Sequence, residues 1–172
     1  SFDDHIKDTL IAGDGLCDEK VVRMVVSDAP QRLDELIAWG TDFDKTDSGA
    51  YDLGKEGGHS TFRILHHKDI TGYEIQKKLV KKVKDAANIT LLDHHFAIDL
   101  ITEHHLGQIV KKDSEITCFG VYALNQATDK IFKILSKVTL LASGGSGQVY
   151  SSTTNPNVAT GDGLALAYRA KA

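Results

Sequence analysis

Apolar side chains in the first forty residues recur with the period of an α-helix. Asp18 precedes one such apolar stripe and is the predicted N-cap of its helix. The stripe comprises Val21, Val22, Met24 and Val25. Pro30 suits the first turn of a second helix, because that position needs no amide donor. Gly40 follows and predicts a left-handed stop, so the chain is expected to begin with helices.

A polar, glycine-rich passage follows at residues 41–60 and predicts a loop that includes a short strand. Thr71 and Glu74 then match a capping box, with Thr71 as the N-cap and Glu74 three residues later. Residues 75, 79 and 83 place apolar side chains on one side of this third helix. Asn88 is expected to end it.

Short apolar runs after residue 88 predict strands. The expected strands are 89–92, 96–101, 108–111, 118–124 and 131–135, and the last three form a β-meander with a turn at 125–130. Residues 138–142 are apolar and lead into Gly144 and Gly145, which is typical of a buried strand in a parallel sheet. A final helix is expected after residues 160–163.

These elements predict an α/β fold with N-terminal helices, a mixed sheet containing the β-meander, and a terminal strand–Gly loop–helix. The later pieces resemble parts of a Rossmann-like, nucleotide-binding fold. The chain does not open with the βαβ unit and G-x-G-x-x-G turn that begin such a fold.

Composition narrows the class of protein. A chain of 172 residues is long enough for one domain, and 20 Lys and Arg against 24 Asp and Glu give a net charge of −4. Nucleic acid is therefore not an expected partner. Cys17 and Cys118 lie far apart in the sequence and form no C-x-x-C motif. They are therefore interpreted as two reduced thiols of a cytoplasmic protein. No apolar run approaches 18 residues, so no membrane span is expected.

Three polar segments could carry chemistry. Residues 142–147 could let a cofactor approach the backbone, although a flexible loop is the simpler interpretation. Residues 160–163 open a helix whose free amides attract ligand oxygens, but Asp162 is more often a cap there. Residues 56–60 combine Glu56 with the imidazole of His59, either as a substrate-binding turn or as a surface loop.

Three pairs of adjacent histidines suggest zinc, but neighbouring residues on a strand or a helix point in different directions. The pairs are His66–His67, His94–His95 and His104–His105. No cysteine or acidic cluster supplies further ligands, so no metal site is predicted.

Six separated motifs occur in one order along the chain: residues 8–13, 56–60, 63–66, 69–72, 142–145 and 150–163. In this order they resemble the L-aspartate oxidases, flavoenzymes of the family that includes succinate dehydrogenase and fumarate reductase flavoprotein subunits. The resemblance spans nearly the whole chain. The succinate dehydrogenase and fumarate reductase flavoprotein subunits usually lack an acid at the position that Glu56 occupies in this chain.

The resemblance implies roles for particular residues. Glu56 would face the substrate amine and favour aspartate over a dicarboxylate that has no amine. The backbone at Phe96 and Ala97 would pack along the adenine side of FAD. The remaining implied FAD contacts are Ser143, Gly144, Gly145 and Asp162. Ser143 replaces the more common threonine of the family and keeps its hydroxyl.

The implied reaction is hydride transfer from Cα of L-aspartate to FAD, which yields iminoaspartate for NAD biosynthesis. Fumarate or O₂ would accept the electrons, and quinolinate synthase is an implied partner. Two alternatives remain: an enzyme of the succinate dehydrogenase or fumarate reductase type, and a folded module without catalytic activity.

The resemblance also implies that residues 1–172 are an internal portion of the FAD-binding domain. The G-x-G-x-x-G unit would precede it, and the capping domain with the catalytic His and Arg residues would follow it. No catalytic residue is therefore assigned within the chain.

The isolated chain is predicted to bind FAD weakly and to have little or no oxidase activity, because these two parts are absent from its sequence. The ultraviolet–visible spectrum of the purified chain checks this expectation. A stoichiometric flavin band near about 450 nm would contradict it.

Overall fold

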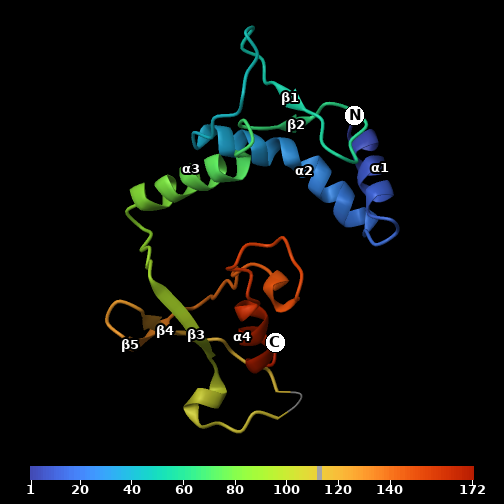
Figure 1. Cartoon of the computed structure of the whole chain (residues 1–172). Coiled ribbons are helices and arrows are strands. Elements are labelled where there is room, and N and C mark those ends of the chain that lie inside the picture. Colours follow the sequence, from blue (N-terminus) through green and yellow to red (C-terminus); the bar gives the residue numbers. More distant parts are fainter. Residues whose placement is uncertain (112–113) are drawn as a thin grey trace. The chain divides into compact units, whose positions relative to one another are not determined.

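The computed structural model describes residues 1–111 and 114–172, and the chain divides into two compact units, Ser1–Leu91 and Leu92–Ala172 (Figure 1). Helices predominate in the first unit, and the second combines a sheet with a helix. This combination of helices and strands is consistent with the predicted α/β class. All strand pairings within the described residues are antiparallel, so the prediction of a mixed sheet is wrong.

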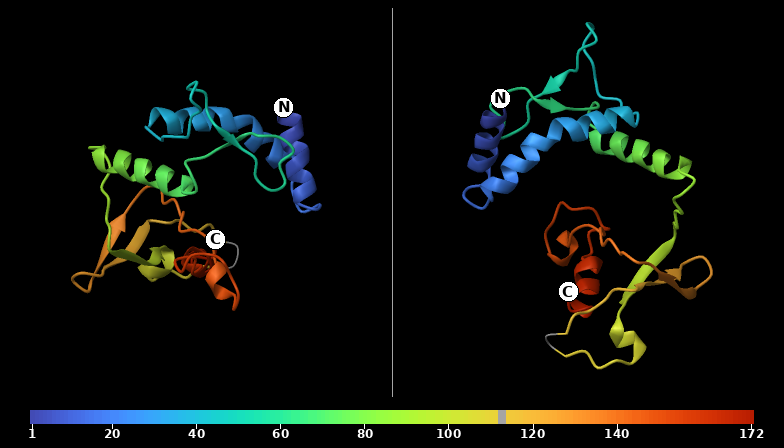
Figure 2. Two further views of the ribbon diagram at one scale, coloured as in Figure 1. Left: turned by 45° about the horizontal axis from the view of Figure 1, so that its top comes forward. Right: turned by 180° about the vertical axis from the view of Figure 1, so that it is seen from behind.

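The first unit is built from α1 (Phe2–Ala12), α2 (Glu19–Ala38), β1 (Leu53–Gly54), β2 (Ile64–Leu65) and α3 (Thr71–Asp85). Helices α1 and α2 pack against each other beside the short loop that joins them (Figure 2). Strands β1 and β2 pair antiparallel. The buried apolar side chains of this unit are few: Ile6, Val26 and Phe43.

The predicted ends of α2 are confirmed. Asp18 accepts hydrogen bonds from the amides of Lys20 and Val21, as an N-cap does. Gly40 has φ +98°, and the amide of Thr41 donates to the carbonyl of Leu36 in a Schellman arrangement.

Pro30 does not begin a new helix, because α2 continues through it without a break. Proline in a helix interior removes one backbone hydrogen bond, and its ring crowds the carbonyl of the preceding turn. Buried Val26 lies one turn before Pro30 and partly buried Leu33 lies one turn after it, so one apolar side runs past the proline. This packing outweighs the lost hydrogen bond.

The capping box predicted for α3 is also wrong. The hydroxyl of Thr71 accepts from the amide of His67, 3.0 Å away, and Thr71 is the first helical residue rather than the cap. Glu74 accepts from the amide of Asp42 and pairs with Lys78 at 3.1 Å. Each of the two side chains therefore has a partner outside the helix, and the helix ends at Asp85 rather than Asn88.

The second unit is built from β3 (His95–Ile101), the 3₁₀ turn η1 (Glu103–Leu106), β4 (Gly120–Asn125), β5 (Lys130–Leu135), the 3₁₀ turn η2 (Gly147–Val149) and α4 (Asp162–Arg169). The sheet order is β3-β4-β5. Helix α4 packs against β3. Leu100, Leu166 and Ala170 form the core between them.

The β-meander is confirmed for its second and third strands, but β3 takes the place of the predicted strand at 108–111. Residues 89–92 and 138–142 are not strands either. A strand needs a neighbour for its backbone groups. Within residues 1–111 and 114–172, no segment pairs with residues 138–142 in a sheet. Apolar composition alone therefore misassigned these runs.

Among the helices of the described residues, none has both the length and the apolar character that a membrane crossing requires.

Substituting Gly120→Ala is expected to destabilise the protein by at least about 2 kcal/mol. Gly120 has φ +140°, and an added Cβ would lie 1.9 Å from the carbonyl oxygen of Ile134 on β5. Urea unfolding followed by circular dichroism measures the effect. Gly72→Ala is the control, because its Cβ meets no atom within 4 Å and helix propensity favours alanine there. Equal unfolding midpoints for the two variants would contradict this explanation.

Candidate functional site

In the second unit, the glycine turn at residues 143–145 lies against the start of α4. The amide of Gly161 donates to the carbonyl of Gly145 at 3.1 Å. A Cβ added to Gly163 would lie 2.0 Å from the hydroxyl oxygen of Ser143. The absence of a side chain at position 163 therefore lets the turn approach the helix. The structure brings together four of the residues named from sequence: Ser143, Gly144, Gly145 and Asp162.

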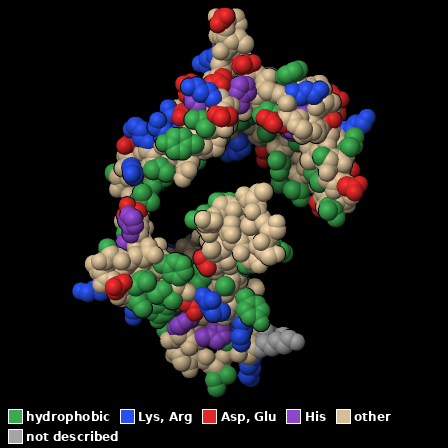
Figure 3. All heavy atoms as spheres, viewed as in Figure 1, with side chains coloured by type: hydrophobic (Ala, Val, Ile, Leu, Met, Phe, Trp, Pro, Cys, Tyr) green, Lys and Arg blue, Asp and Glu red, His purple; other side chains and the backbone are tan. Residues whose placement is uncertain are grey.

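The surface of this turn is mostly backbone. Gly144 has φ +81°, and a Cβ added to Gly144 or Gly145 would meet nothing within 4 Å. The segment that follows is rich in glycine, serine and threonine, and it forms a largely uncharged surface in the space-filling view (Figure 3). A ligand can therefore approach the main chain directly at this turn.

Asp162 is not the helix cap that the pattern favoured. Gly161 is the N-cap, in the left-handed conformation with φ 79°, and it has no side chain with which to cap the helix. The Asp162 carboxylate is exposed and accepts from the hydroxyl of Thr160 at 2.7 Å. The amides of residues 162–164 have no hydrogen-bond partner among the residues that the structure describes. These donors and the carboxylate are available to the oxygens and hydroxyls of a ligand.

The implied cofactor FAD carries phosphates, ribityl and ribose hydroxyls and a flat ring system, and the residues present fit such a group. Open glycine backbone admits close approach, unpaired helix amides suit phosphate oxygens, and an exposed carboxylate suits hydroxyls. This fit rests on the turn at 143–145 and on the start of α4.

Phe96 and Ala97 lie on β3, where they pair with Leu124 and Ala123 of β4. Both are exposed. Helix α4 packs on β3 through Leu166 and its C-cap Ala170, and its last residue, Arg169, pairs with Asp99 of β3 at 3.3 Å. Asp162 begins the same helix, about 10 Å away along its axis at 1.5 Å per residue. Within the described residues, no hydrogen bond joins Phe96 or Ala97 to the glycine turn.

Glu56 belongs to the first unit. It begins a tight turn in which the amide of His59 donates to the carbonyl of Glu56 at 3.1 Å, and Gly58 takes φ +83°. The Glu56 side chain is exposed and has no hydrogen-bond or ion-pair partner within the described ranges. Its carboxylate is therefore available to a cation. The turn, predicted as either a binding turn or a surface loop, presents an acid at the surface.

The turn is held by Asp8, a residue that sequence reasoning placed only within a family motif. One carboxylate oxygen of Asp8, Oδ2, accepts from the amide of Ser60, the hydroxyl of Ser60 and Nη1 of Arg63, each at 2.8 Å. The side chains of Asp8 and Arg63 are each only 14% exposed. The Ser60 amide, then its hydroxyl, and then Arg63 hold the pKa of Asp8 at about 2.

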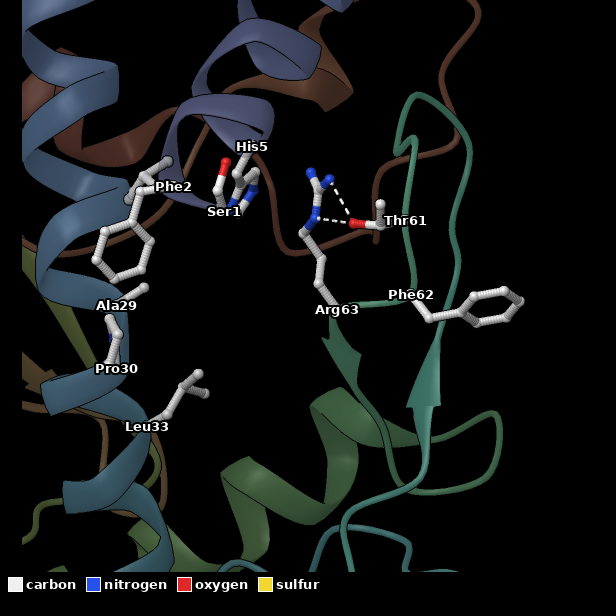
Figure 4. Close-up of a pocket in the computed structure, with 10 residues that line it drawn as sticks. Ser1, Phe2, His5, Ala29, Pro30, Leu33, Thr61, Phe62 and Arg63 are labelled. Atoms are coloured by element: carbon white, nitrogen blue, oxygen red, sulfur yellow. Dashed lines mark hydrogen bonds between the residues drawn. The ribbon is translucent and has the colours of Figure 1, made fainter.

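Arg63 extends the network beyond Asp8. Its guanidinium donates to Thr61 Oγ1 at 2.7 Å (Figure 4) and lies 3.2 Å from Nδ1 of His59. The His5 and His59 rings lie 5.2 Å apart. Burial, and then the charge of Arg63, lower the pKa of His5.

A cavity of about 550 Å³ lies beside Arg63 and His5 (Figure 4). Its walls are mainly apolar and come from α1, α2 and residues 61–63. The lining side chains include Phe2, Val26, Ala29, Pro30 and Leu33. Arg63, which pairs with Asp8, thus forms the charged edge of this cavity.

A second acidic anchor lies near the β1–β2 pair. Asp44 accepts from the amide of Lys68 at 2.6 Å and lies 3.1 Å from Nδ1 of His66. The Lys68 amide lowers the pKa of Asp44. In the part of the chain that the structure describes, no three His, Cys, Asp or Glu side chains form a group that could hold a metal ion.

Comparisons with known proteins identify the family of this chain. A family model described as the FAD binding domain matches residues 1–172. The chloroplastic L-aspartate oxidase of Oryza sativa subsp. japonica is 49% identical over 172 residues, which are 100% of this chain and 26% of that protein. The L-aspartate oxidase of Vibrio cholerae is 42% identical over 175 residues, covering 99% of this chain and 32% of that protein.

Among solved structures, a variant of the E. coli quinol fumarate reductase matches with a TM-score of 0.84 and 27% identity. The match covers 98% of this chain and 27% of that one. The chain thus spans about a quarter to a third of the length of the curated relatives it matches.

Asp8 is expected to make stability depend on pH in the acidic range. The pKa of Asp8 is about 2 in the folded chain and 3.8 in its ordinary environment. Its stabilising effect is therefore present above pH 4 and is lost as the pH falls through about 2. Urea unfolding at pH 4 and pH 2 should show a larger loss for the natural chain than for Asp8→Asn. Equal losses would show that this carboxylate is not stabilised in its charged form.

Proposed function

The chain belongs to the FAD binding domain family, and we propose that the complete protein is an FAD-dependent L-aspartate oxidase. The observation that carries the proposal is the Glu56 carboxylate, which the first unit presents on an anchored turn without a partner in the described structure. A fixed carboxylate attracts an ammonium group and gives no comparable attraction to a dicarboxylate that has no amine.

In the proposed reaction, L-aspartate loses two electrons and two protons across its Cα–N bond and becomes iminoaspartate. Bound FAD supplies the two-electron acceptor. Glu56 binds the substrate amine and so sets the orientation of the substrate in the site. Fumarate or O₂ then accepts the electrons from the enzyme.

Residues of the second unit are proposed to hold the cofactor. The backbone of Ser143, Gly144 and Gly145 would lie beside it, because no side chain blocks that turn. The Asp162 carboxylate would accept hydrogen bonds from its hydroxyls. Phe96 and Ala97 would flank its adenine side from β3.

The proposal extends to the setting of the reaction. Residues 1–172 would form an internal portion of the FAD-binding domain, with a phosphate-binding unit before it and a capping domain after it. Iminoaspartate would feed NAD biosynthesis, with quinolinate synthase as the partner enzyme. The proposed location is the cytoplasm, as the two unpaired thiols suggest; the names of the plant relatives specify the chloroplast for those proteins.

The second candidate is a flavoprotein of the succinate dehydrogenase or fumarate reductase type. The likeness to the quinol fumarate reductase structure favours it, at 27% identity. The higher identity to L-aspartate oxidases, 42–49% in the two relatives described, and the charge of Glu56 favour the first candidate. A module without catalytic activity is the third candidate.

Glu56→Gln in the complete protein is expected to lower kcat/KM for L-aspartate by about 100-fold, because it removes the charge that faces the amine. Fumarate reduction should change by less than about threefold, since fumarate has no amine. Aspartate-dependent peroxide formation and fumarate-dependent flavin reoxidation measure the two activities. Glu19→Gln, an exposed glutamate on α2, is the matched control and should change neither.

Equal losses of both activities in Glu56→Gln would contradict the amine-binding role. Fumarate reduction without aspartate oxidation in the natural protein would favour the second candidate. Absence of both activities would favour the module.

A further inference from the structure

We propose that Asp8 is a positioning residue for substrate selection: it holds the segment 56–63, and with it the Glu56 carboxylate, against helix α1. This inference rests on the proposed role of Glu56. It assigns to α1 a task beyond packing, because the helix then sets where the selecting charge is presented.

The tether begins at one oxygen atom. Asp8 Oδ2 accepts three hydrogen bonds, two from Ser60 and one from Arg63, and all three are 2.8 Å long. Charge-assisted hydrogen bonds of this length are stronger than neutral ones. The donors lie 52 and 55 residues away in sequence. One carboxylate thus fixes two points of the segment that follows Glu56.

The same side of α1 makes the neighbouring contacts. His5, Asp8 and Ala12 follow the spacing i, i+3 and i+7, which places them along one face of a helix. The His5 ring lies beside His59. A Cβ added to Gly58 would lie 3.5 Å from the Cβ of Ala12, so the turn lies directly on the helix. This face of α1 therefore matches the shape of the Glu56 turn.

The segment is also closed at its base. The amide of Arg63 donates to the carbonyl of Gly54 at 3.1 Å, where β1 and β2 pair. Glu56 thus lies between this pairing and the Asp8 tether. The amide of His59 closes the turn onto the Glu56 carbonyl. Because the Glu56 side chain has no hydrogen-bond or ion-pair partner in the described structure, the backbone that carries it sets the region that its carboxylate can reach.

Loss of the Asp8 charge would affect Arg63 first. The Arg63 side chain is only 14% exposed, and the contacts of its guanidinium other than Asp8 are with Thr61, Ser60 and His59, which carry no negative charge. A shielded cation without its counter-charge is unfavourable and moves toward water. Arg63 is part of the tethered segment, so this movement would displace the Glu56 turn as well.

The test uses the complete protein with bound FAD and compares five forms: the natural protein, Asp8→Ala, Asp8→Asn, Glu56→Gln and the double variant of Asp8→Ala with Glu56→Gln. Asp3→Ala is the control, because Asp3 lies on the same helix, is 89% exposed and pairs only with Arg23, at 3.7 Å, in the described structure. KM and kcat are measured for L-aspartate and for fumarate, together with flavin content.

A second readout does not depend on activity. Hydrogen–deuterium exchange reports the amide of Ser60, which donates to Asp8. This amide should exchange at least about tenfold faster in Asp8→Ala than in the control. Asp8→Asn retains an acceptor and the shape of the side chain, and it should lie between the two. It also keeps the test decisive if Asp8→Ala does not fold.

Asp8→Ala is expected to raise KM for L-aspartate about tenfold, with kcat within about threefold and KM for fumarate within about twofold. In the Glu56→Gln background, Asp8→Ala should cause no further rise, because both changes act through the same carboxylate. The control should match the natural protein in every readout.

Three results would overturn the inference. The first is that Glu56→Gln raises KM for aspartate but Asp8→Ala and Asp8→Asn do not. The second is that the two Asp8 variants lower both activities and flavin content alike. In either case Asp8 has only a structural role, and the proposed function stands. If Glu56→Gln has no selective effect on aspartate, the proposed role of Glu56 fails and the inference fails with it.

Discussion

The arrangement of the first unit depends on one carboxylate that joins residues far apart in the chain. Asp8 on α1 accepts from Ser60 and Arg63, more than fifty residues later. The unit has few buried apolar side chains, chiefly Ile6, Val26 and Phe43. Hydrophobic burial grows with the apolar area removed from water, so it supplies little specificity here. Polar tethers such as Asp8, and Asp44 beside β2, therefore decide how the loops of this unit lie.

In the second unit, glycines at three positions allow segments to approach more closely than a side chain would permit. Gly120 lets β4 approach β5, Gly163 admits the hydroxyl of Ser143, and Gly161 brings its amide to the carbonyl of Gly145. In each case a Cβ would meet another group at 2.9 Å or less. A contact of this kind constrains the fold as strongly as a buried side chain, because close packing leaves no space for the added atom. The glycine turn and the start of α4 thus form one continuous surface.

Sequence patterns predicted the elements whose signals are local. Asp18 caps α2 through amides two and three residues away, and Gly40 ends it through bonds within the last turn. The prediction for Thr71 and Glu74 failed because both side chains bind groups outside the helix. Residues 138–142 were expected to form a strand because they are apolar, yet a strand also requires a neighbour that local sequence does not reveal. The Asp8 tether was missed for the same reason, since its donors are distant in sequence, although the spacing of His5, Asp8 and Ala12 could have indicated one functional face.

The proposed cofactor surface and the proposed substrate-selecting residue use different kinds of interaction, and this difference would let one fold serve several substrates. The proposed cofactor surface uses backbone amides and glycine positions, so most side-chain changes around it leave it intact. A backbone match with a TM-score of 0.84 at only 27% identity to a quinol fumarate reductase is consistent with this view. The proposed substrate selection uses one charge, Glu56, which depends on its anchors for its position. Under this proposal, a change at Glu56 would alter specificity without altering the fold, whereas a change at Asp8 would alter specificity by moving the segment that carries Glu56.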